Sequence, residues 1–293
     1  MNPFSLKQHL SVNRRLDYLE NVEGKTPQDL LPEYIDNNVL NLELDTPIYR
    51  IFNAQRFYEM LENRQLMLVR PRCWEDPFEN FLLSARWELE DGTIINAASI
   101  RDRYYGQCWT MRKECDGLWR NYRGERPDPE APYPPAFKVA TTVRKLMGQF
   151  YDPTVPGHTL TFFVGKVEYR SDEEIKAYFS EPEKMNTSEQ MANIRYPQTL
   201  LVKRQAFSYE EEVRMIYSEN RSGTSPAPPA GSPLHPVAID PDALFDFVEL
   251  DPWMTVIDRW QAEERIRAAG FTGSVTQSSL YNSPDFVVRV ARG

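Results

Sequence analysis

The 293-residue chain has few of the residues that usually hold disulfides or structural metals. Cys73, Cys108 and Cys115 are an odd number and contain no CxxC pair, and no histidine stands near them. A disulfide framework and a structural zinc site are therefore not expected. The three histidines, His9, His158 and His235, are scattered among loop-like residues. We expect them to be isolated polar residues at the surface.

Long hydrophobic runs are also missing. No stretch approaches the roughly 20 apolar residues that a membrane-spanning helix needs. The first ten residues are polar and lack the apolar core of a signal peptide. The sequence therefore predicts no membrane association and a reduced, cytoplasmic location.

Several well-known catalytic motifs are absent as well. The chain contains no Walker-A loop, no GxGxxG, no HExxH and no GxSxG. These absences argue against nucleoside triphosphatases, Rossmann enzymes, zinc proteases and α/β-hydrolases. The net charge of −9 argues against a nonspecific grip on nucleic acid by the whole surface, although a local basic groove remains compatible with it. Aromatic residues make up 12% of the chain, which favours a stiff core and a ring-lined pocket.

The hydrophobic pattern predicts an α+β fold of short mixed strands with peripheral helices. Residues 1–45 are expected to be an N-terminal helical extension with a helix over 5–22, and 46–293 a single core domain. The proline-rich segment 220–236 is expected to be a flexible loop. Strands are predicted over 48–52, 66–69, 105–110, 137–141, 160–169, 213–217 and 247–250, and near 274 and 286. Helices are predicted over 54–63, 116–122, 143–150, 171–179, 183–193 and 255–269. Residues 81–95 fit either a helix or a hairpin broken at Asp91-Gly92.

Two of the polar features on this scaffold come early in the chain. Tyr49-Arg50 lies in an otherwise apolar strand. The arginine either faces solvent or points into a cleft, where its planar fork can hold a carboxylate or a phosphate. Trp74-Glu75-Asp76-Pro77-Phe78-Glu79 is either a structural turn, with Asp76 capping a helix that starts at Pro77, or the polar wall of a pocket.

A third feature joins Trp109-Thr110, at the end of a predicted strand, to Trp119 and Tyr122 on the next helix. Core packing is the simpler role of the two helical rings, and the alternative is a set of rings and hydroxyls in a pocket. The fourth feature is Glu210-Glu211-Glu212-Val213-Arg214. In an extended chain, alternation places Glu210, Glu212 and Arg214 on one face and Glu211 on the other. Arg214 either forms an internal ion pair with a glutamate or helps to position that glutamate for chemistry.

Taken together, the sequence resembles the bacterial family called domain of unknown function 2971. The resemblance covers about residues 46–281 and implies a bacterial cytoplasmic protein of unspecified activity, found in some cases near mobile or defence genes. It is carried by Ile48-Tyr-Arg, Trp74-Glu-Asp-Pro-Phe-Glu, Cys108-Trp-Thr, Trp119-Arg-Asn-Tyr, Lys203-Arg204, Phe207-Ser-Tyr-Glu-Glu-Glu-Val-Arg, Leu250-Asp-Pro and Ser279-Leu-Tyr.

A second, weaker resemblance is to ADP-ribosyltransferases, which carry three motifs in a fixed order. These are an arginine or histidine on the first core strand, a hydroxyl or aromatic residue on a middle strand, and a glutamate at the start of a later strand. Arg50, Thr110 and Glu210-x-Glu212 are similar to this series. The chain departs from it at Cys108-Trp109-Thr110, where the family has Ser-Thr-Ser. The resemblance implies a split β core.

The ADP-ribosyltransferase resemblance also implies a chemistry and a cofactor, NAD. Glu212 would bind the ribose and stabilise the cation that forms when the nicotinamide bond breaks. Glu210 would orient or activate the acceptor. Tyr49 and Arg50 would bind the cofactor, with Tyr58, Trp109 and Thr110 near the nicotinamide. Asp76, Glu79, Trp119, Tyr122 and Arg214 are further pocket candidates.

On this interpretation the protein catalyses NAD-dependent ADP-ribosyl transfer or NAD glycohydrolysis, as a bacterial toxin or a phage-defence effector. Two alternatives remain open. Asp76, Glu79, Glu210 and Glu212 could bind Mg²⁺ in a metal-dependent nuclease of a defence system, although no D…ExK pattern is present and no metal is predicted. Otherwise the protein is a non-catalytic binding module. The acceptor, whether protein, nucleic acid or small molecule, and the oligomeric state are not predicted.

Overall fold

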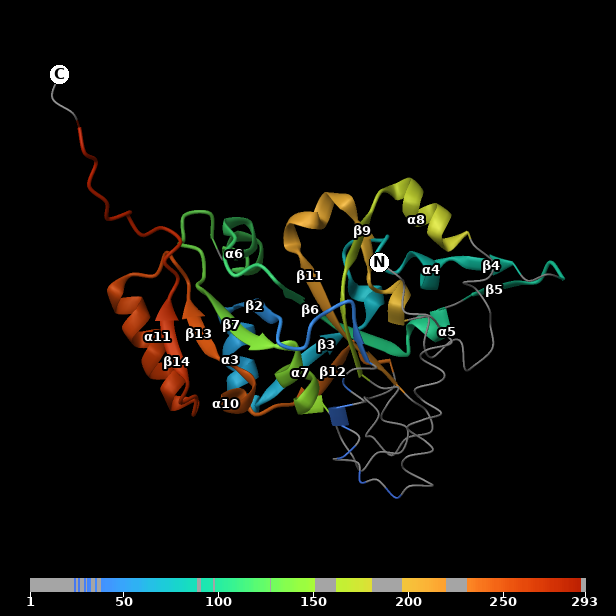
Figure 1. Ribbon diagram of the computed structural model, residues 1–293, viewed down its shortest axis with the longest axis horizontal. Helices are drawn as coiled ribbons and strands as arrows, with labels where there is room; N and C mark the ends of the chain where they lie inside the picture. Colours follow the sequence, from blue (N-terminus) through green and yellow to red (C-terminus); the bar gives the residue numbers. More distant parts are fainter. Residues whose placement is uncertain are drawn as a thin grey trace.

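The computed structural model describes residues 38–88, 91–96, 98–126, 128–150, 162–180, 197–219 and 231–290, together with isolated positions between 24 and 35. A large mixed sheet forms the centre of the molecule. In Figure 1, α11, β13 and β14 lie at one end of the view and the separate β4–β5 hairpin at the other. Helices lie around the sheet, so the chain is a single α+β domain, as the sequence predicts. No helix among these residues is long and apolar enough to span a bilayer.

The main sheet has the order β1-β8-β11-β6-β2-β7-β13-β14, with β3 pairing β6 and β12 pairing β3. Most of its neighbouring strands are antiparallel, and the pairs β1–β8 and β13–β14 are parallel. Its strands are β1 (Val39–Leu40), β2 (Pro47–Asn53), β3 (Gln65–Val69), β6 (Tyr104–Thr110), β7 (Ala136–Thr142), β8 (Phe162–Lys166), β11 (Glu212–Ser218), β12 (Leu234–Ala238), β13 (Phe247–Leu250) and β14 (Ser274–Gln277). The two smaller sheets consist of β4 (Arg86–Glu88) with β5 (Ile94–Asn96), and β9 (Glu168–Arg170) with β10 (Val202–Arg204).

The helices begin and end at local sequence signals. Asn53 caps α3 by accepting a hydrogen bond from the Arg56 amide, and Thr255 and Asp258 form a capping box on α11. Gly270, with φ at +89°, follows α11, as a helix end favours. The helices are α3 (Ala54–Asn63), α4 (Phe81–Ser84), α5 (Ala98–Arg101), α6 (Asp116–Tyr122), α7 (Val143–Phe150), α8 (Asp172–Phe179), α10 (Pro241–Leu244) and α11 (Val256–Ala268), with 3-10 turns η1 (Pro71–Cys73) and η4 (Gln205–Glu210).

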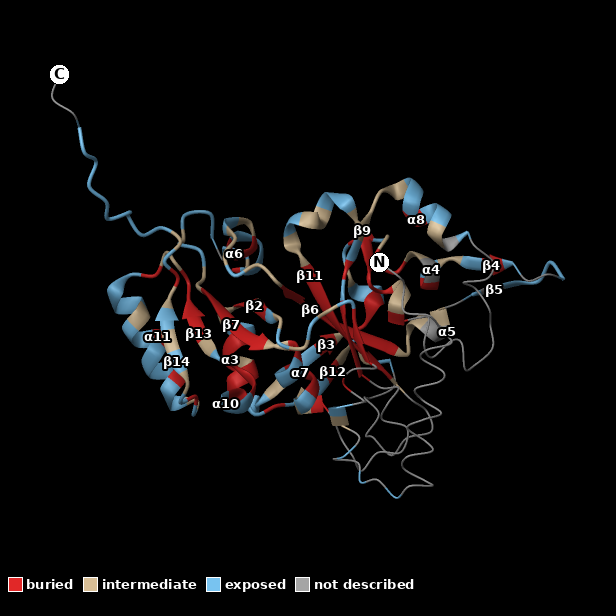
Figure 2. Ribbon diagram, viewed as in Figure 1, coloured by how far each residue is buried: buried red, intermediate tan, exposed pale blue. Residues whose placement is uncertain are grey.

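Figure 2 shows that the burial is concentrated in the central strands, while the outer side of α11 and the C-terminal segment are exposed. The largest core cluster packs α3 against the sheet, where the rings of Phe57 and Phe137 stack at 4.3 Å. A smaller cluster places Leu118 and Trp119 of α6 against Ile51 of β2. The alternating side chains of β2 thus face different helices, which fixes how its residues 49–51 are presented.

Several predicted elements match closely. The predicted strand-helix-strand start appears as β2, α3 and β3, and the helices 116–122 and 143–150 have the predicted bounds. Residues 81–95 contain both alternatives, because the short helix α4 precedes the β4–β5 hairpin. The 160–169 strand is two strands, since β8 ends at Lys166 and β9 begins at Glu168.

Other predictions are wrong. The residues around Phe286 are not a strand, and the Phe286 side chain is exposed. His235 is not a surface residue: it is 8% exposed and stacks on Tyr217 with ring centroids 4.4 Å apart. The end of the segment 220–236 enters β12, where Pro236 fits because β12 is an edge strand that pairs only with β3 among the described strands.

Part of the segment 1–45, predicted to be an extension, belongs to the main sheet. Val39–Leu40 pairs with β8 there. The helices predicted over 5–22 and 183–193 and most of the segment 220–236 lie outside the described residues.

Candidate functional site

The sheet has a seam between β2 and β6, the residues 48–52 and 106–110. These two strands pair at one position, Tyr49 with Thr110, whereas β2 pairs with β7 along its whole length. Further along, β6 pairs with β3 at Val69 and Gly106. The backbone of β6 between these two positions therefore lacks a regular ladder on this side.

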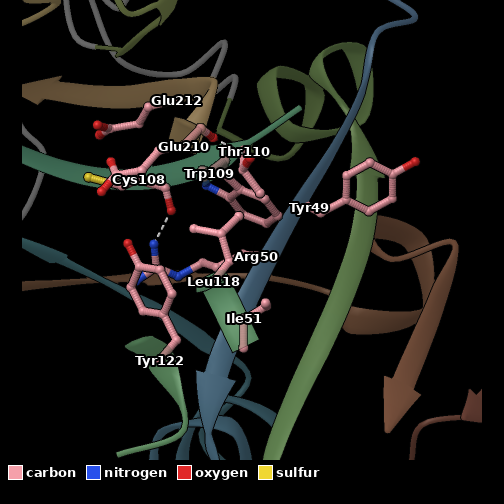
Figure 3. Close-up of a pocket in the computed structure, with 10 residues that line it drawn as sticks. All are labelled: Tyr49, Arg50, Ile51, Cys108, Trp109, Thr110, Leu118, Tyr122, Glu210 and Glu212. Carbon is pink, nitrogen blue, oxygen red and sulfur yellow. Dashed lines mark hydrogen bonds between the residues drawn. The ribbon is translucent and has the colours of Figure 1, made fainter. Parts of the chain in front are cut away.

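Arg50 fills part of the seam. Its Nη1 donates a hydrogen bond to the Cys108 carbonyl, drawn as the dashed line in Figure 3, where the guanidinium lies beside the ring of Tyr122. The guanidinium also lies 4.9 Å from the ring centre of Phe52, and its Nε is buried without a hydrogen-bond partner. Burial lowers the pKa of Arg50, but an arginine stays charged at neutral pH. The strand arginine thus points into the protein, one of the two predicted orientations.

A cavity opens beside Arg50, and we call it the seam cavity. It measures about 330 Å³ with its open mouth included, at the lower end for small-molecule sites, and only about 20 Å³ of it is wide enough for water. Its walls come from β2, β6, α6, η4 and β11 (Figure 3), and the lining residues are Tyr49, Arg50, Ile51, Cys108, Trp109, Thr110, Leu118, Tyr122, Glu210 and Glu212.

Beside the cavity lies a group of five charged side chains, four buried and one, Glu210, half-buried. We call it the Lys203 cluster: Glu79, Lys203, Glu210, Glu212 and Arg214. Lys203 Nζ lies 2.8, 2.6 and 3.0 Å from carboxylate oxygens of Glu79, Glu210 and Glu212. Arg214, fully buried, contacts Glu212 through Nε at 2.7 Å and Nη2 at 3.1 Å. The cluster carries three negative and two positive charges, so one negative charge is left over.

The local backbone explains how two of these glutamates meet. β11 begins at Glu212, and Glu210 ends the 3-10 turn η4. Glu211 between them has φ at +42°, a left-handed conformation that reverses the chain and turns its own side chain toward Arg112. The hydroxyl of Tyr169 accepts the Glu212 amide at 2.8 Å. Alternation along an extended chain correctly predicts the shared face of Glu212 and Arg214, but the turn, not alternation, brings Glu210 to them.

The two glutamates differ in protonation behaviour. Burial pushes the pKa of Glu212 upward, but Arg214 and Lys203 outweigh it and hold the pKa at about 2. Burial raises the pKa of Glu210, and Lys203 only partly opposes this shift. Lys203 is itself buried, which lowers its pKa, but Glu212 and Glu79 raise the pKa above its ordinary value. Glu212 is therefore a fixed negative charge, while Glu210 is the carboxylate closer to accepting a proton.

Thr110 ties the middle strand to this turn. Its hydroxyl donates to the Glu210 carbonyl and accepts the Arg112 amide at 3.0 Å. Beside it, the indole of Trp109 is buried and donates to Gln107 at 3.1 Å. Burial raises the pKa of the neighbouring Cys108 thiol, and the negative charge of Glu212 raises it further. This thiol therefore stays protonated.

The structure brings most of the predicted site residues together. Arg50, Trp109, Thr110, Tyr122, Glu210 and Glu212 line the seam cavity, and Glu79 and Arg214 join the cluster beside it. Tyr122, 40% exposed, stands at the mouth. Tyr49 contributes to the lining, but its ring points away from Arg50 (Figure 3) and packs 6.5 Å from Phe247.

Three predicted residues lie elsewhere. Tyr58 packs against Phe137 and lines a different cavity. Trp119 of α6 is fully buried in the core against β2. Asp76 forms an ion pair with Arg204 at 3.0 Å. Asp76 also accepts the Phe78 amide at 3.0 Å, so it caps a turn, and the helix begins only at Phe81. These residues are not brought to the seam cavity.

Lys203 was not singled out as a site residue, although it is central to the cluster. The sequence signal for a buried lysine is its position in Leu200-Leu-Val-Lys-Arg, between apolar residues and a turn. Its ammonium lies among the carboxylates where a bound cation would lie. No group of three or more histidine, cysteine, aspartate or glutamate side chains within the described ranges is arranged to hold a metal ion.

No protein family model matches the chain, so the resemblance to domain of unknown function 2971 is not shown, and the chain has no match among curated proteins. Among solved structures it is similar to DarT of Thermus sp. 2.9 in complex with NAD+, with a TM-score of 0.36 and 10% identity over 81% of this chain and 98% of that one. For DarT of Thermus sp. 2.9 in complex with ADP-ribosylated ssDNA, the TM-score is 0.35 and the identity 11%, over 80% and 94% of the two chains. Similarity at this level does not establish a common function, so the function must be argued from the side chains.

Proposed function

We propose that the protein transfers ADP-ribose from NAD, to an acceptor or to water, at the seam cavity. The observation that carries the proposal is the convergence of Arg50, Thr110, Glu210 and Glu212 on one cavity, although they are far apart in sequence. Such a cavity, with a fixed cation on one wall and carboxylates on another, suits a ligand that has both anionic and cationic parts.

The chemistry follows from the charges. The bond between the nicotinamide nitrogen and the ribose carbon breaks, and its electron pair leaves with nicotinamide. The ribose becomes an oxocarbenium-like cation, which the negative charge of Glu212 stabilises. An acceptor oxygen or nitrogen then bonds to that carbon and gives its proton to Glu210, whose raised pKa suits proton transfer. Arg50 neutralises a phosphate or orients the ribose.

The size of the cavity sets a condition on this proposal. Its enclosed part has room for about one water molecule, whereas the whole recess with its mouth is about 330 Å³. The nicotinamide end would enter the recess, and the remainder of NAD would lie over the mouth near Tyr122. The seam must widen slightly for this to happen.

A non-catalytic binding module is the second candidate, and one observation favours it. Both Glu212 oxygens already have partners, Oε1 at Arg214 and Oε2 at Lys203 and Arg214. A carboxylate this fully paired serves well as a structural anchor. The same experiment separates the two candidates.

The test measures nicotinamide release from NAD by the purified protein and its Glu210→Gln variant. We expect the variant to lose roughly 100-fold or more of the turnover, as general-base removal does. The matched control is Glu211→Gln, since Glu211 is adjacent, has the same chemistry and pairs with Arg112 at the surface. It should keep the wild-type rate.

A second variant addresses Glu212. Glu212→Gln should abolish turnover in protein that circular dichroism shows to be folded. The proposal fails if wild-type protein neither binds nor consumes NAD, or if folded Glu210→Gln and Glu212→Gln proteins turn NAD over at the wild-type rate. NAD binding by calorimetry without any turnover would support the binding module.

A further inference from the structure

A second and larger cavity lies next to the seam cavity and shares none of its lining residues. It has about 590 Å³ of room for water, within the usual range for ligand sites. Its walls come from α3, Arg123, the residues 132–135, β7, the residues 251–255 and α11. Arg123, which follows the seam residue Tyr122, lines it, and we call it the Arg123 cavity.

The Arg123 guanidinium is unusually placed for a charged group. The side chain is 10% exposed and lies between two rings, 4.6 Å from the centre of Tyr133 and 4.3 Å from that of Trp253. Among the described residues, its Nε is buried without a hydrogen-bond partner. Its Nη2 forms only a long ion pair, 3.8 Å from Asp251 Oδ2. Asp251 is already occupied by the amides of Ala136 and Trp253 at 3.0 and 2.8 Å.

This arrangement carries a free-energy cost that a ligand would remove. A buried guanidinium loses its hydration, and a long ion pair at 3.8 Å to Asp251 compensates only part of that loss. The two rings hold it in place by cation–π contact and keep its planar fork rigid. Arg123 lines the cavity, and its terminal nitrogens, unlike Nε, are not among the fully buried atoms that lack a partner. A bidentate anion such as a phosphate would satisfy them.

Other parts of the cavity wall are aromatic. Tyr133 is 46% exposed, and Tyr58 carries the Arg265 guanidinium 3.6 Å from its ring centre. Rings and arginine planes of this kind stack on nucleobases, which are themselves flat. The acidic residue Asp258 also lines the cavity, but it already accepts hydrogen bonds from the Thr255 hydroxyl and amide at 2.7 and 3.2 Å.

We propose that the Arg123 cavity binds a nucleotide, with a phosphate on the Arg123 fork and the base against the aromatic walls. The shared chemistry, one phosphate and one base, occurs in a free nucleotide and in single-stranded nucleic acid. This site is independent of the proposed function: it requires no NAD and no chemistry at the seam.

The test is a set of calorimetric titrations with AMP, adenosine, inorganic phosphate and an eight-nucleotide single-stranded DNA. We expect AMP to bind more tightly than either adenosine or phosphate. Arg123→Gln should weaken AMP binding by about tenfold or more, since it removes the charged fork. The matched control is Arg120→Gln. Arg120 lies on α6, which ends just before Arg123, and is 5.0 Å from the Trp253 ring, but it is exposed and does not line the cavity. It should stay within about twofold.

Further measurements keep the result interpretable. Trp253→Leu should weaken the binding of AMP and of adenosine to the same extent. In the wild-type protein, AMP should slow the modification of Arg123 by phenylglyoxal but not that of Arg120. DNA that binds much more tightly than AMP would identify a single strand as the ligand, and equal binding a free nucleotide. The proposal is overturned if no probe binds, if adenosine binds as well as AMP, or if AMP binding survives Arg123→Gln but is lost in Arg50→Lys, which would assign it to the seam.

Discussion

Among the described residues, two buried lysines are surrounded by carboxylates, and only Lys203 pairs with carboxylates that line the seam cavity. Lys203 meets Glu79, Glu210 and Glu212 beside the seam cavity. Lys138 of β7 forms ion pairs with Glu114 and Glu249, and we call these three charged residues the Lys138 cluster. The Lys138 ammonium lies 5.3 Å from the ring centre of Trp119 and 5.8 Å from that of Tyr49. Of the two described cavities, neither is lined by a member of the Lys138 cluster.

The two clusters perturb their carboxylates in the same way. Burial raises the pKa of Glu249, as it does that of Glu210, with a lysine opposing it in each case. Burial also pushes the pKa of Glu114 upward, but Lys138 outweighs it, as Arg214 and Lys203 do at Glu212. Perturbed pKa values therefore do not distinguish the site here. The distinguishing features are the seam cavity and the arginine and threonine on its other walls.

The largest expected effect comes from removing a buried cation. Arg214→Met leaves Glu212 and Glu79 with Lys203 alone, and Lys138→Met leaves Glu114 and Glu249 without a cation. Each should lower the free energy of unfolding by about 3–5 kcal/mol, because uncompensated charges remain buried. Urea unfolding followed by circular dichroism measures both. A loss below about 1 kcal/mol in either variant would show that water already reaches that cluster.

Acid should affect the Lys203 cluster strongly. The pKa of Glu212 is lowered from 4.5 to about 2 in the folded protein, where burial is outweighed by Arg214 and Lys203. The stabilisation is complete above pH 4.5 and is lost as the pH falls toward 2, since the unfolded state binds the proton first. About 3 kcal/mol is at stake, from the linkage value per pH unit. Urea midpoints measured between pH 5 and 2.5 should fall throughout this window.

His235 provides the necessary control for that experiment. Burial, with a contribution from Arg70, lowers the pKa of His235 to about 4, so this residue costs stability as the pH falls from 6.5 to 4. His235→Phe keeps a ring on Tyr217 and should flatten the stability between pH 6.5 and 4 without removing the fall below 4.5. If the fall below pH 4.5 also disappears, Glu212 is not its cause.

The smallest effect on stability is expected from Glu249→Gln in the Lys138 cluster. Because burial disfavours the charge of Glu249, its neutral isostere should change the free energy of unfolding by no more than about 1 kcal/mol. Nicotinamide release should remain at the wild-type rate, in contrast to Glu210→Gln. A comparable loss of turnover in both variants would mean that the two clusters do not differ in function.

Much of the secondary structure could be predicted from local pattern. The apolar spacing and the caps in Asn53 to Asn63 specify a helix, and the site strand was found because Glu212 and Arg214 alternate with apolar residues. The strand predicted near Phe286 is wrong because Phe-Val-Val has strand propensity, but none of the described strands pairs with it. His235 was misplaced because the burial of a histidine depends on rings, here Tyr105 and Tyr217, that are distant in sequence.

The site itself could be predicted only in part. The order of Arg50, Thr110 and Glu212 in the sequence suggested one cleft, and they do line one cavity. Lys203 and the Lys138 cluster were beyond local pattern, since a lysine in an apolar strand is compatible with a solvent-facing edge until its neighbours are known. The resemblance to ADP-ribosyltransferases places Tyr58 near the nicotinamide, but α3 carries Tyr58 to the Arg123 cavity.

The seam has a consequence for motion. Hydrogen exchange should be faster at the amides of residues 107–109 than at 137–140. The latter lie in continuous ladders on both sides, whereas residues 107–109 have a regular ladder only with β11. Breaking the Tyr49–Thr110 pair costs on the order of 1 kcal/mol per hydrogen bond, which thermal fluctuations supply frequently. The seam is therefore the part of the sheet where we expect the backbone to open most readily. Such an opening would widen the seam cavity, whose enclosed part has room for about one water molecule.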